Sequence, residues 1–174
     1  MIREAAPDDL GAITDIYNEA ILEGGFTGDL EPLAVAGRRG WFSDHDGKYA
    51  ILVHCIDGSV VGYVALSPYR KGRRAFDRTC ELSYYVFAKC RGRGIGTNLI
   101  QAALARAREA GFRTVLAIVL ACNPRSIDLL ERFGFVVCGR LPGVARIAGA
   151  TIDHIYLSRC LELADVVTQT PSAG

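Results

Sequence analysis

A glycine-rich turn between a strand pattern and a helix pattern constrains this chain more than any other feature. The strand-like run over residues 79–87 ends in Tyr-Tyr-Val-Phe, and the segment Arg-Gly-Arg-Gly-Ile-Gly at residues 91–96 then leads into a helical pattern. Glycine tolerates positive φ, so the backbone can curl tightly and present consecutive amides to an anion, and the helix start adds its dipole. The segment therefore predicts a phosphate-binding turn.

Two common nucleotide motifs fit this turn poorly. A dinucleotide fingerprint needs a third glycine where Thr97 stands, and a P-loop needs a lysine that residues 95–98 do not contain. Six residues alone are also compatible with a plain loop, so the choice depends on the rest of the chain.

Length and composition favour one domain. The chain has 174 residues, half of them apolar, which is enough for one well-buried core and too little for two ordinary domains. We expect a single domain over residues 1–163 and a disordered tail over residues 164–174.

Charge and hydropathy limit the partners. Lysine and arginine number 20 against 19 acids, so the chain lacks the broad basic field that nucleic acids select. We interpret the basic cluster at residues 70–74 as a solvated loop. No apolar run approaches the roughly 20 residues needed to span a bilayer, and the first residues lack a signal-peptide core. We expect a cytoplasmic protein that binds neither nucleic acid nor membrane.

The cysteines and histidines argue against a metal site. The six cysteines contain no C-x-x-C pair and several lie in apolar runs, which predicts reduced thiols in the core. The three histidines are far apart in the sequence and lack ligand spacing. We therefore expect no metal.

Periodicity and turn residues predict a mixed α/β fold. The expected order is strand, two helices, three antiparallel strands, helix, strand, helix and two strands. Asp57-Gly58 predicts a hairpin, Asn123-Pro124 a helix start, and the aliphatic run 114–120 a strand buried on both faces. The other expected elements are helices from Pro7 to about Gly24, from near Pro32, and from Ile95 to Gly111, and strands at 49–56, 60–67, 79–87, 135–140 and 151–159.

These features resemble the GCN5-related N-acetyltransferase (GNAT) superfamily over residues 1–163. The turn is similar to its R/Q-x-x-G-x-G/A loop, which cradles the pyrophosphate of acetyl-coenzyme A, and residues 123–135 resemble its N-x-x-S-x-x-L-x-x-x-x-G-F stretch. Residues 68–81 are similar to the phosphinothricin and methionine sulfoximine acetyltransferase branch, with one extra residue before Arg73.

The resemblance implies a GNAT fold, with a mostly antiparallel twisted sheet of about seven strands flanked by about four helices. It implies acetyl-CoA as co-substrate, a small amino-acid-like amine as acceptor, and a homodimer. The residues that it assigns to the coenzyme are Tyr84, Tyr85, Val86, Arg91, Gly92, Arg93, Gly94, Ile95, Gly96, Thr97, Asn123 and Ser126.

The resemblance also suggests residues for the chemistry. Amines are mostly protonated at neutral pH, so a base is needed, and Glu81 stands where the family carries one, usually acting through a water. A bulge in the strand 79–87 is expected to splay it from its neighbour and free the Val86 amide for the oxyanion. Arg73 or Arg74 is placed to bind an acceptor carboxylate, and Phe26 echoes the branch as a substrate contact.

Several alternatives stay open. Leu130 stands where tyrosine or histidine is common, so we name no general acid, and a thiol is already a good leaving group. Asn123 is also the residue that a helix cap requires. Direct transfer is favoured over a route through an acetylated Cys122. The rival functions are acetylation of a protein N-terminus or lysine, and non-catalytic sensing of acyl-CoA.

Overall fold

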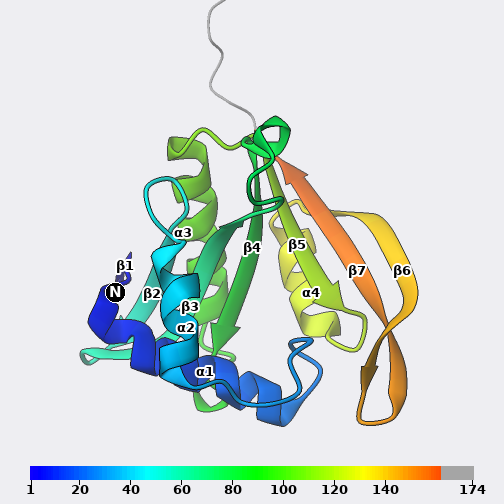
Figure 1. Cartoon of the computed structure of the whole chain (residues 1–174), viewed down its shortest axis with the longest axis horizontal. Coiled ribbons are helices and arrows are strands. Elements are labelled where there is room, and N and C mark those ends of the chain that lie inside the picture. Colours follow the sequence, from blue (N-terminus) through cyan, green and yellow to red (C-terminus); the bar gives the residue numbers. More distant parts are fainter. Residues whose placement is uncertain (162–174) are drawn as a thin grey trace, which may run out of the picture.

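A seven-stranded sheet with helices on both faces forms the described part of the molecule, residues 1–161 of a computed structural model (Figure 1). The strand order is β1-β2-β3-β4-β5-β7-β6, and the predicted element order and fold class are confirmed. The tail predicted for 164–174 lies outside the described residues. The strands are β1 (Ile2–Glu4), β2 (Ile51–Ile56), β3 (Ser59–Pro68), β4 (Thr79–Val86), β5 (Thr114–Leu120), β6 (Val136–Ile147) and β7 (Ala150–Cys160). The helices are α1 (Leu10–Glu23), α2 (Val35–Ser43), α3 (Ile95–Glu109) and α4 (Pro124–Arg132).

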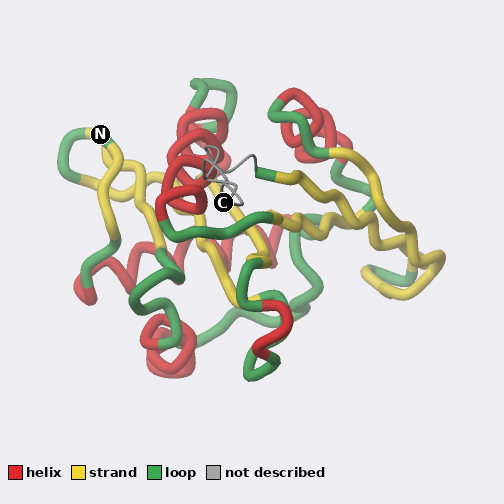
Figure 2. The backbone as a smooth tube through the Cα atoms, turned by 90° about the horizontal axis from the view of Figure 1, so that it is seen from above, coloured by secondary structure: helices red, strands yellow, loops and turns green. Residues whose placement is uncertain are grey.

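The sheet separates the core into two layers, each covered by a pair of helices (Figure 2). Helices α1 and α2 cover one face of β2 and β3, where Ile13, Ile16 and Tyr63 are fully buried. On the other face of the sheet, α3 covers β2, β3 and β4 and α4 lies beside β5, with Leu99 and Leu130 in the larger cluster (Figure 1). Strand β4 contributes to both layers, because Leu82 and Tyr84 pack in the larger cluster and Tyr85 packs against the smaller one.

Local signals act as expected at several boundaries. Asp57 and Gly58 both have positive φ, as a two-residue hairpin turn requires, and join β2 to β3. Asn123 accepts a hydrogen bond from the Ser126 amide at 3.2 Å, with Pro124 in the first turn of α4. At the chain start a short 3-10 turn, Pro7–Asp9, precedes α1 because the Asp9 carboxylate binds the Ala6 amide.

The sheet opens between β4 and β5. These strands pair in parallel from Thr79 to Glu81 and then diverge, as their ribbons do in Figure 1. The predicted splay is therefore present, but the expected bulge is not. The register between β3 and β4 runs without a shift from Pro68↔Cys80 to Gly62↔Val86. The opening arises because β5 pairs along its whole length with β7 and turns away from β4.

Three expectations about burial and length were wrong in part. Strand β5 buries only Val115, Ala117 and Leu120, because its second half diverges from β4 and lines the cavities described below. Strand β6 continues past the predicted end at residue 140 to Ile147, since this edge strand absorbs Pro142 at an irregularity between Leu141 and Ala145. Of the six free cysteines, three are buried and three are exposed: Cys122, Cys138 and Cys160.

Candidate active site

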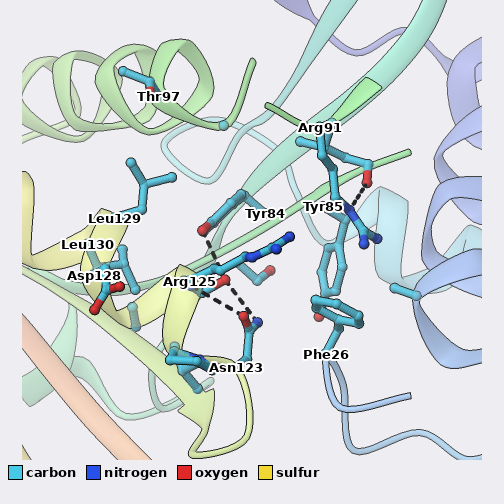
Figure 3. A pocket seen from close by; sticks show the side chains of 18 of the residues that line it. Phe26, Tyr84, Tyr85, Arg91, Thr97, Asn123, Arg125, Asp128, Leu129 and Leu130 are labelled. Atoms are coloured by element: carbon cyan, nitrogen blue, oxygen red, sulfur yellow. Dashed lines mark hydrogen bonds between the residues drawn. The ribbon is translucent and has the colours of Figure 1, made fainter. Parts of the chain in front are cut away.

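A cleft of about 850 Å³ occupies the opening between β4 and β5. Its walls come from residues 82–86 of β4 and 117–119 of β5, the glycine turn, the start of α3, and helix α4. Figure 3 shows the view into it, with Tyr84 directed from β4 toward Asn123 and with Phe26, Tyr85 and Arg91 on the opposite side.

The glycine turn has the backbone that phosphate binding requires. Gly92 and Gly94 have φ of +75° and +76°, and a Cβ at either would point into open space. The Asn98 amide donates to the Gly94 carbonyl at 3.0 Å, which is the first hydrogen bond of the helix. The backbone amides before Asn98 have no acceptor within the helix. Consecutive free amides and the positive end of the α3 dipole thus face the cleft beside Gly96 and Thr97.

The two arginines of the turn differ in position. Arg91 donates through Nε to the Val86 carbonyl at 3.1 Å, pairs with Glu23 at 2.7 Å, and stacks over Phe26 at 4.6 Å. It therefore forms a fixed wall of the cleft. Arg93 is exposed and does not line the cleft, whereas Arg125, which the sequence did not single out, does.

The start of α4 presents a small polar network to the cleft. The Tyr84 hydroxyl donates to Ser126 Oγ at 3.0 Å, and Asn123 Nδ2 donates to the same oxygen at 2.9 Å. Burial raises the pKa of Tyr84, so its hydroxyl stays protonated. Leu130 lies in the core beside this network, and Gly96 brings α3 close to Tyr84.

Backbone geometry leaves the Val86 amide available. The Phe87 amide donates to the Val61 carbonyl of β3 at 3.1 Å. Because amide directions alternate along a strand, the Val86 amide points away from β3, toward the opening. The carbonyl of Val86 is occupied by Arg91, but its amide has no partner in the sheet at this point. It can donate to an oxyanion in the cleft.

A second cavity, of about 420 Å³, lies on the α1–α2 side of the sheet and contains Glu81. The two cavities share four lining residues: Phe26, Ser83, Tyr85 and Ile118. No hydrogen bond or ion pair joins the Glu81 carboxylate to another of the described residues, and burial raises its pKa. A carboxylate in this setting is a stronger base than an exposed one.

Not all predicted residues reach these cavities. Glu81 lines the second, Phe26 lines both, and most of the predicted coenzyme residues line the first. The structure brings Arg73 and Arg74 to neither cavity, because the loop before β4 turns outward and exposes both. Arg38 on α2, which the sequence did not single out, lines the second cavity instead, three residues before Trp41.

This chain shares its architecture, a sheet that opens between two parallel-paired strands beside a glycine turn, with acetyltransferases of known structure. Residues 12–135 match the acetyltransferase (GNAT) family, and the chain belongs to this family. It is an N-acetyltransferase by family, and its similarity to the phosphinothricin and methionine sulfoximine branch extends over most of its length.

Individual relatives support this assignment. The L-methionine sulfoximine/L-methionine sulfone acetyltransferase of Pseudomonas aeruginosa is 34% identical over 92% of this chain and 94% of its own length. The L-amino acid N-acyltransferase MnaT of Escherichia coli is 30% identical over 92% of this chain and 94% of its own. The structure of a phosphinothricin acetyltransferase from Sinorhizobium meliloti in complex with acetyl-CoA has a TM-score of 0.88 and 32% identity, covering 92% of this chain and 88% of that one.

Neither a membrane-spanning helix nor a metal cluster is present in the described part of the chain. None of the helices within residues 1–161 is both long and apolar enough to cross a bilayer. Within the same residues, no three histidine, cysteine, aspartate or glutamate side chains gather as a metal site.

Proposed function

We propose that the protein transfers the acetyl group of acetyl-CoA directly to the amine of a small amino-acid-like acceptor. The observation that carries this proposal is the meeting of two cavities at Phe26, Ser83, Tyr85 and Ile118. The larger cavity has a phosphate-type turn at its mouth, and the smaller one contains a basic carboxylate. A thioester entering from one side and an amine entering from the other would meet at the shared residues.

The larger cavity fits coenzyme A. The free amides after Gly94 suit the pyrophosphate, and Asn123 with Ser126 suits the amides of the pantetheine arm. Acetyl-CoA, when bound, supplies the thioester that carries the acetyl group. The Val86 amide supports the charge that develops on its carbonyl oxygen.

Glu81 is the candidate base in the smaller cavity. The acceptor amine must lose a proton before it attacks, and a reference amine pKa of about 8 or higher leaves little free amine at neutral pH. The raised pKa of Glu81 brings the carboxyl closer to the working pH, which favours proton transfer. Glu81 acts either directly or through a water, as in the family pattern.

The leaving thiolate needs less help. Leu130 offers no proton, and a thiol with a reference pKa near 8.5 leaves readily. Cys122 lines the larger cavity, but its thiol contacts the Gly25 carbonyl at 3.6 Å and no imidazole among residues 1–161 bonds to it. This environment favours direct transfer over an acetyl-cysteine intermediate.

Thiol release with a panel of acceptors tests the proposal. The protein is incubated with acetyl-CoA and methionine, methionine sulfoximine, phosphinothricin or lysine-containing peptides. We expect free coenzyme A to appear with the small amino acids and their analogues. Thiol release with peptides alone would contradict the proposed acceptor class, and the absence of release with every amine would contradict the activity.

A further inference from the structure

Helix α2 places an arginine in the second cavity without giving it an acidic partner. We propose that Arg38, together with the Tyr63 hydroxyl, binds the acidic group of the acceptor, a carboxylate or an equivalent oxyanion. This inference rests on the proposed function, because it assigns one end of the acceptor whose amine Glu81 serves. It places this role on α2 and β3, not on Arg73 or Arg74.

Each of the two side chains has a buried polar atom without a hydrogen-bond partner in the described chain. Arg38 is only 6% exposed and Tyr63 only 1% exposed, yet both line the cavity. Arg38 Nη1 and Tyr63 Oη have no hydrogen-bond partner within residues 1–161. No ion pair there joins Arg38 to a carboxylate either. A buried charge is costly unless it is paired, so this arrangement calls for an anion from outside the chain.

Aromatic rings hold the guanidinium in place. It lies 4.1 Å from the centroid of the Trp41 ring and 4.4 Å from that of Tyr17, and Tyr63 is next at 6.0 Å. Cation–π contacts stabilise the charge but leave its hydrogen-bond donors free. Burial raises the pKa of Tyr63 although Arg38 opposes the shift, so the phenol remains protonated and able to donate.

The surrounding structure is rigid enough to keep this geometry. Asn18 of α1 bonds to both the amide and the carbonyl of Leu33, at 2.8 and 2.9 Å, and so fixes the segment that leads into α2. At the other end of α2, His45 bonds to the Trp41 carbonyl at 2.7 Å and to Ser67 Oγ at 2.8 Å. The oxyanion site is therefore organised before the acceptor arrives.

The other titratable side chains of the cavity are compatible with a zwitterionic acceptor. Glu81 and His154 line the same cavity, and Asp29 accepts a hydrogen bond from Tyr17 at 2.6 Å. Arg38 is the only arginine or lysine among the residues that line it in the described structure. The rings of Tyr17 and Tyr63 separate Arg38 from Tyr85, which lines both cavities. An acceptor can thus direct its amine toward Glu81 and its acidic group toward Arg38.

Trp41 provides a direct probe of binding, since it is the only tryptophan of the chain and stacks on Arg38. Its fluorescence is followed while the protein, saturated with coenzyme A, is titrated with methionine or with methioninamide. We expect a saturable change with methionine and a dissociation constant about 10- to 100-fold weaker for the amide, since charge-assisted hydrogen bonds are lost. Glutamine and isoglutamine then distinguish an α-carboxylate from a side-chain carboxylate as the group bound.

Arg38→Met removes the charge and keeps much of the volume, and exposed Arg39→Met is the matched control. For Arg38→Met we expect KM for methionine to rise about 10- to 100-fold and KM for methioninamide to stay unchanged. Arg39→Met should change neither. Coenzyme binding measured by calorimetry reports whether each variant folds. If Arg38→Met does not fold, Tyr63→Phe replaces it, with a smaller expected rise in KM for methionine.

The outcomes separate this inference from the proposed function. Equal affinity of the unmodified protein for methionine and methioninamide would overturn the oxyanion site, even if both amines are acetylated. Selective binding of methionine without any acetylation would support the site and contradict the activity. A loss of methionine affinity in Arg39→Met equal to that in Arg38→Met would also overturn the inference.

Discussion

Glu81 shows how one residue can be placed by strand alternation and then tuned by its surroundings. On β4 it faces the α1–α2 side with Ser83 and Tyr85, opposite Ser67 in the neighbouring strand. Nothing in residues 1–161 pairs with its carboxylate, so desolvation alone raises its pKa. The sequence could identify this residue because a glutamate in a buried strand pattern is unusual unless it is functional.

The change Glu81→Gln tests its role as a base. We expect kcat/KM for the acceptor to fall by about 10²- to 10⁴-fold, because the amide keeps the shape of the side chain but cannot accept the proton. Affinity for coenzyme A, measured by calorimetry, should stay the same. Exposed Glu131→Gln on α4 is the control. Unchanged turnover in Glu81→Gln would remove Glu81 from the mechanism.

The pH dependence of the unmodified protein follows from the same residue. The base works only when it is ionised, so kcat/KM falls as the pH drops through the pKa of Glu81. Burial raises this pKa, so the fall should be centred above about 4.3, the value of an ordinary glutamate. A rate profile from pH 4 to pH 9 measures it. If the residual activity of Glu81→Gln shows the same fall in kcat/KM at low pH, that fall reports the titration of another group.

Arg38 marks the limit of residue-level prediction. Its partners are brought together by tertiary packing, with Tyr17 from α1, Trp41 from α2 and Tyr63 from β3. Nothing in the local pattern of α2 reveals that the side chain is buried. Arg73 and Arg74 drew attention because they precede β4 in the sequence, but position along the chain did not bring them to a cavity.

At the scale of elements, the glycine turn depends on backbone conformation, which substitution can test. Gly94 and Gly72 both have positive φ, +76° and +79°, and a Cβ at either meets no atom within 4 Å. Alanine at either position should therefore cost a similar strain, of about 1–2 kcal/mol. Only Gly94→Ala adds a methyl group beside the proposed phosphate site.

We expect Gly94→Ala to weaken coenzyme A binding by about tenfold or more, and Gly72→Ala to leave it unchanged, since the Gly72 loop lies outside the cleft. Calorimetry measures the affinity and thermal unfolding measures the strain. Equal affinity in the two variants, with similar losses of stability, would show that the turn does not approach the coenzyme.

Elements with strong local signals could be predicted, and those shaped by their neighbours could not. Helix α4 has its cap and proline in the sequence, and the β2–β3 hairpin has Asp57-Gly58. The end of β6 was missed because Pro142 normally stops a strand. Here the Asp153 carboxylate of β7 accepts from the Gly143 amide at 2.8 Å and also binds Arg140, which holds the irregular segment against the sheet.

At the scale of the molecule, the order of elements was predictable because sheet connections follow simple rules, but the opening of the sheet was not. It depends on β5 following β7 instead of β4 after Leu116. This divergence creates the larger cavity, and the covering of β2 and β3 by α1 and α2 creates the smaller one. The site is thus a property of strand geometry more than of any motif.

The edge strand β6 bears on the expected homodimer. It exposes four apolar side chains, Val136, Val137, Leu141 and Val144, at 63, 52, 45 and 56% of their surface. An edge strand with an exposed apolar row is a site for pairing with another chain unless it is covered. We therefore expect that, if the predicted homodimer forms, the second copy of this chain pairs through β6.

Sedimentation velocity tests this assembly. We expect a species of about twice the chain mass of 18.8 kDa, and a tenfold or larger weakening of the dimer in the double variant Val136→Lys/Val144→Lys. Lysine on an edge strand opposes pairing without disturbing the core, so circular dichroism should be unchanged. Leu22→Lys, at a side chain that is 74% exposed on α1, controls for added charge. A monomeric unmodified protein, or a double variant that still dimerises as tightly, would rule out β6 as the interface.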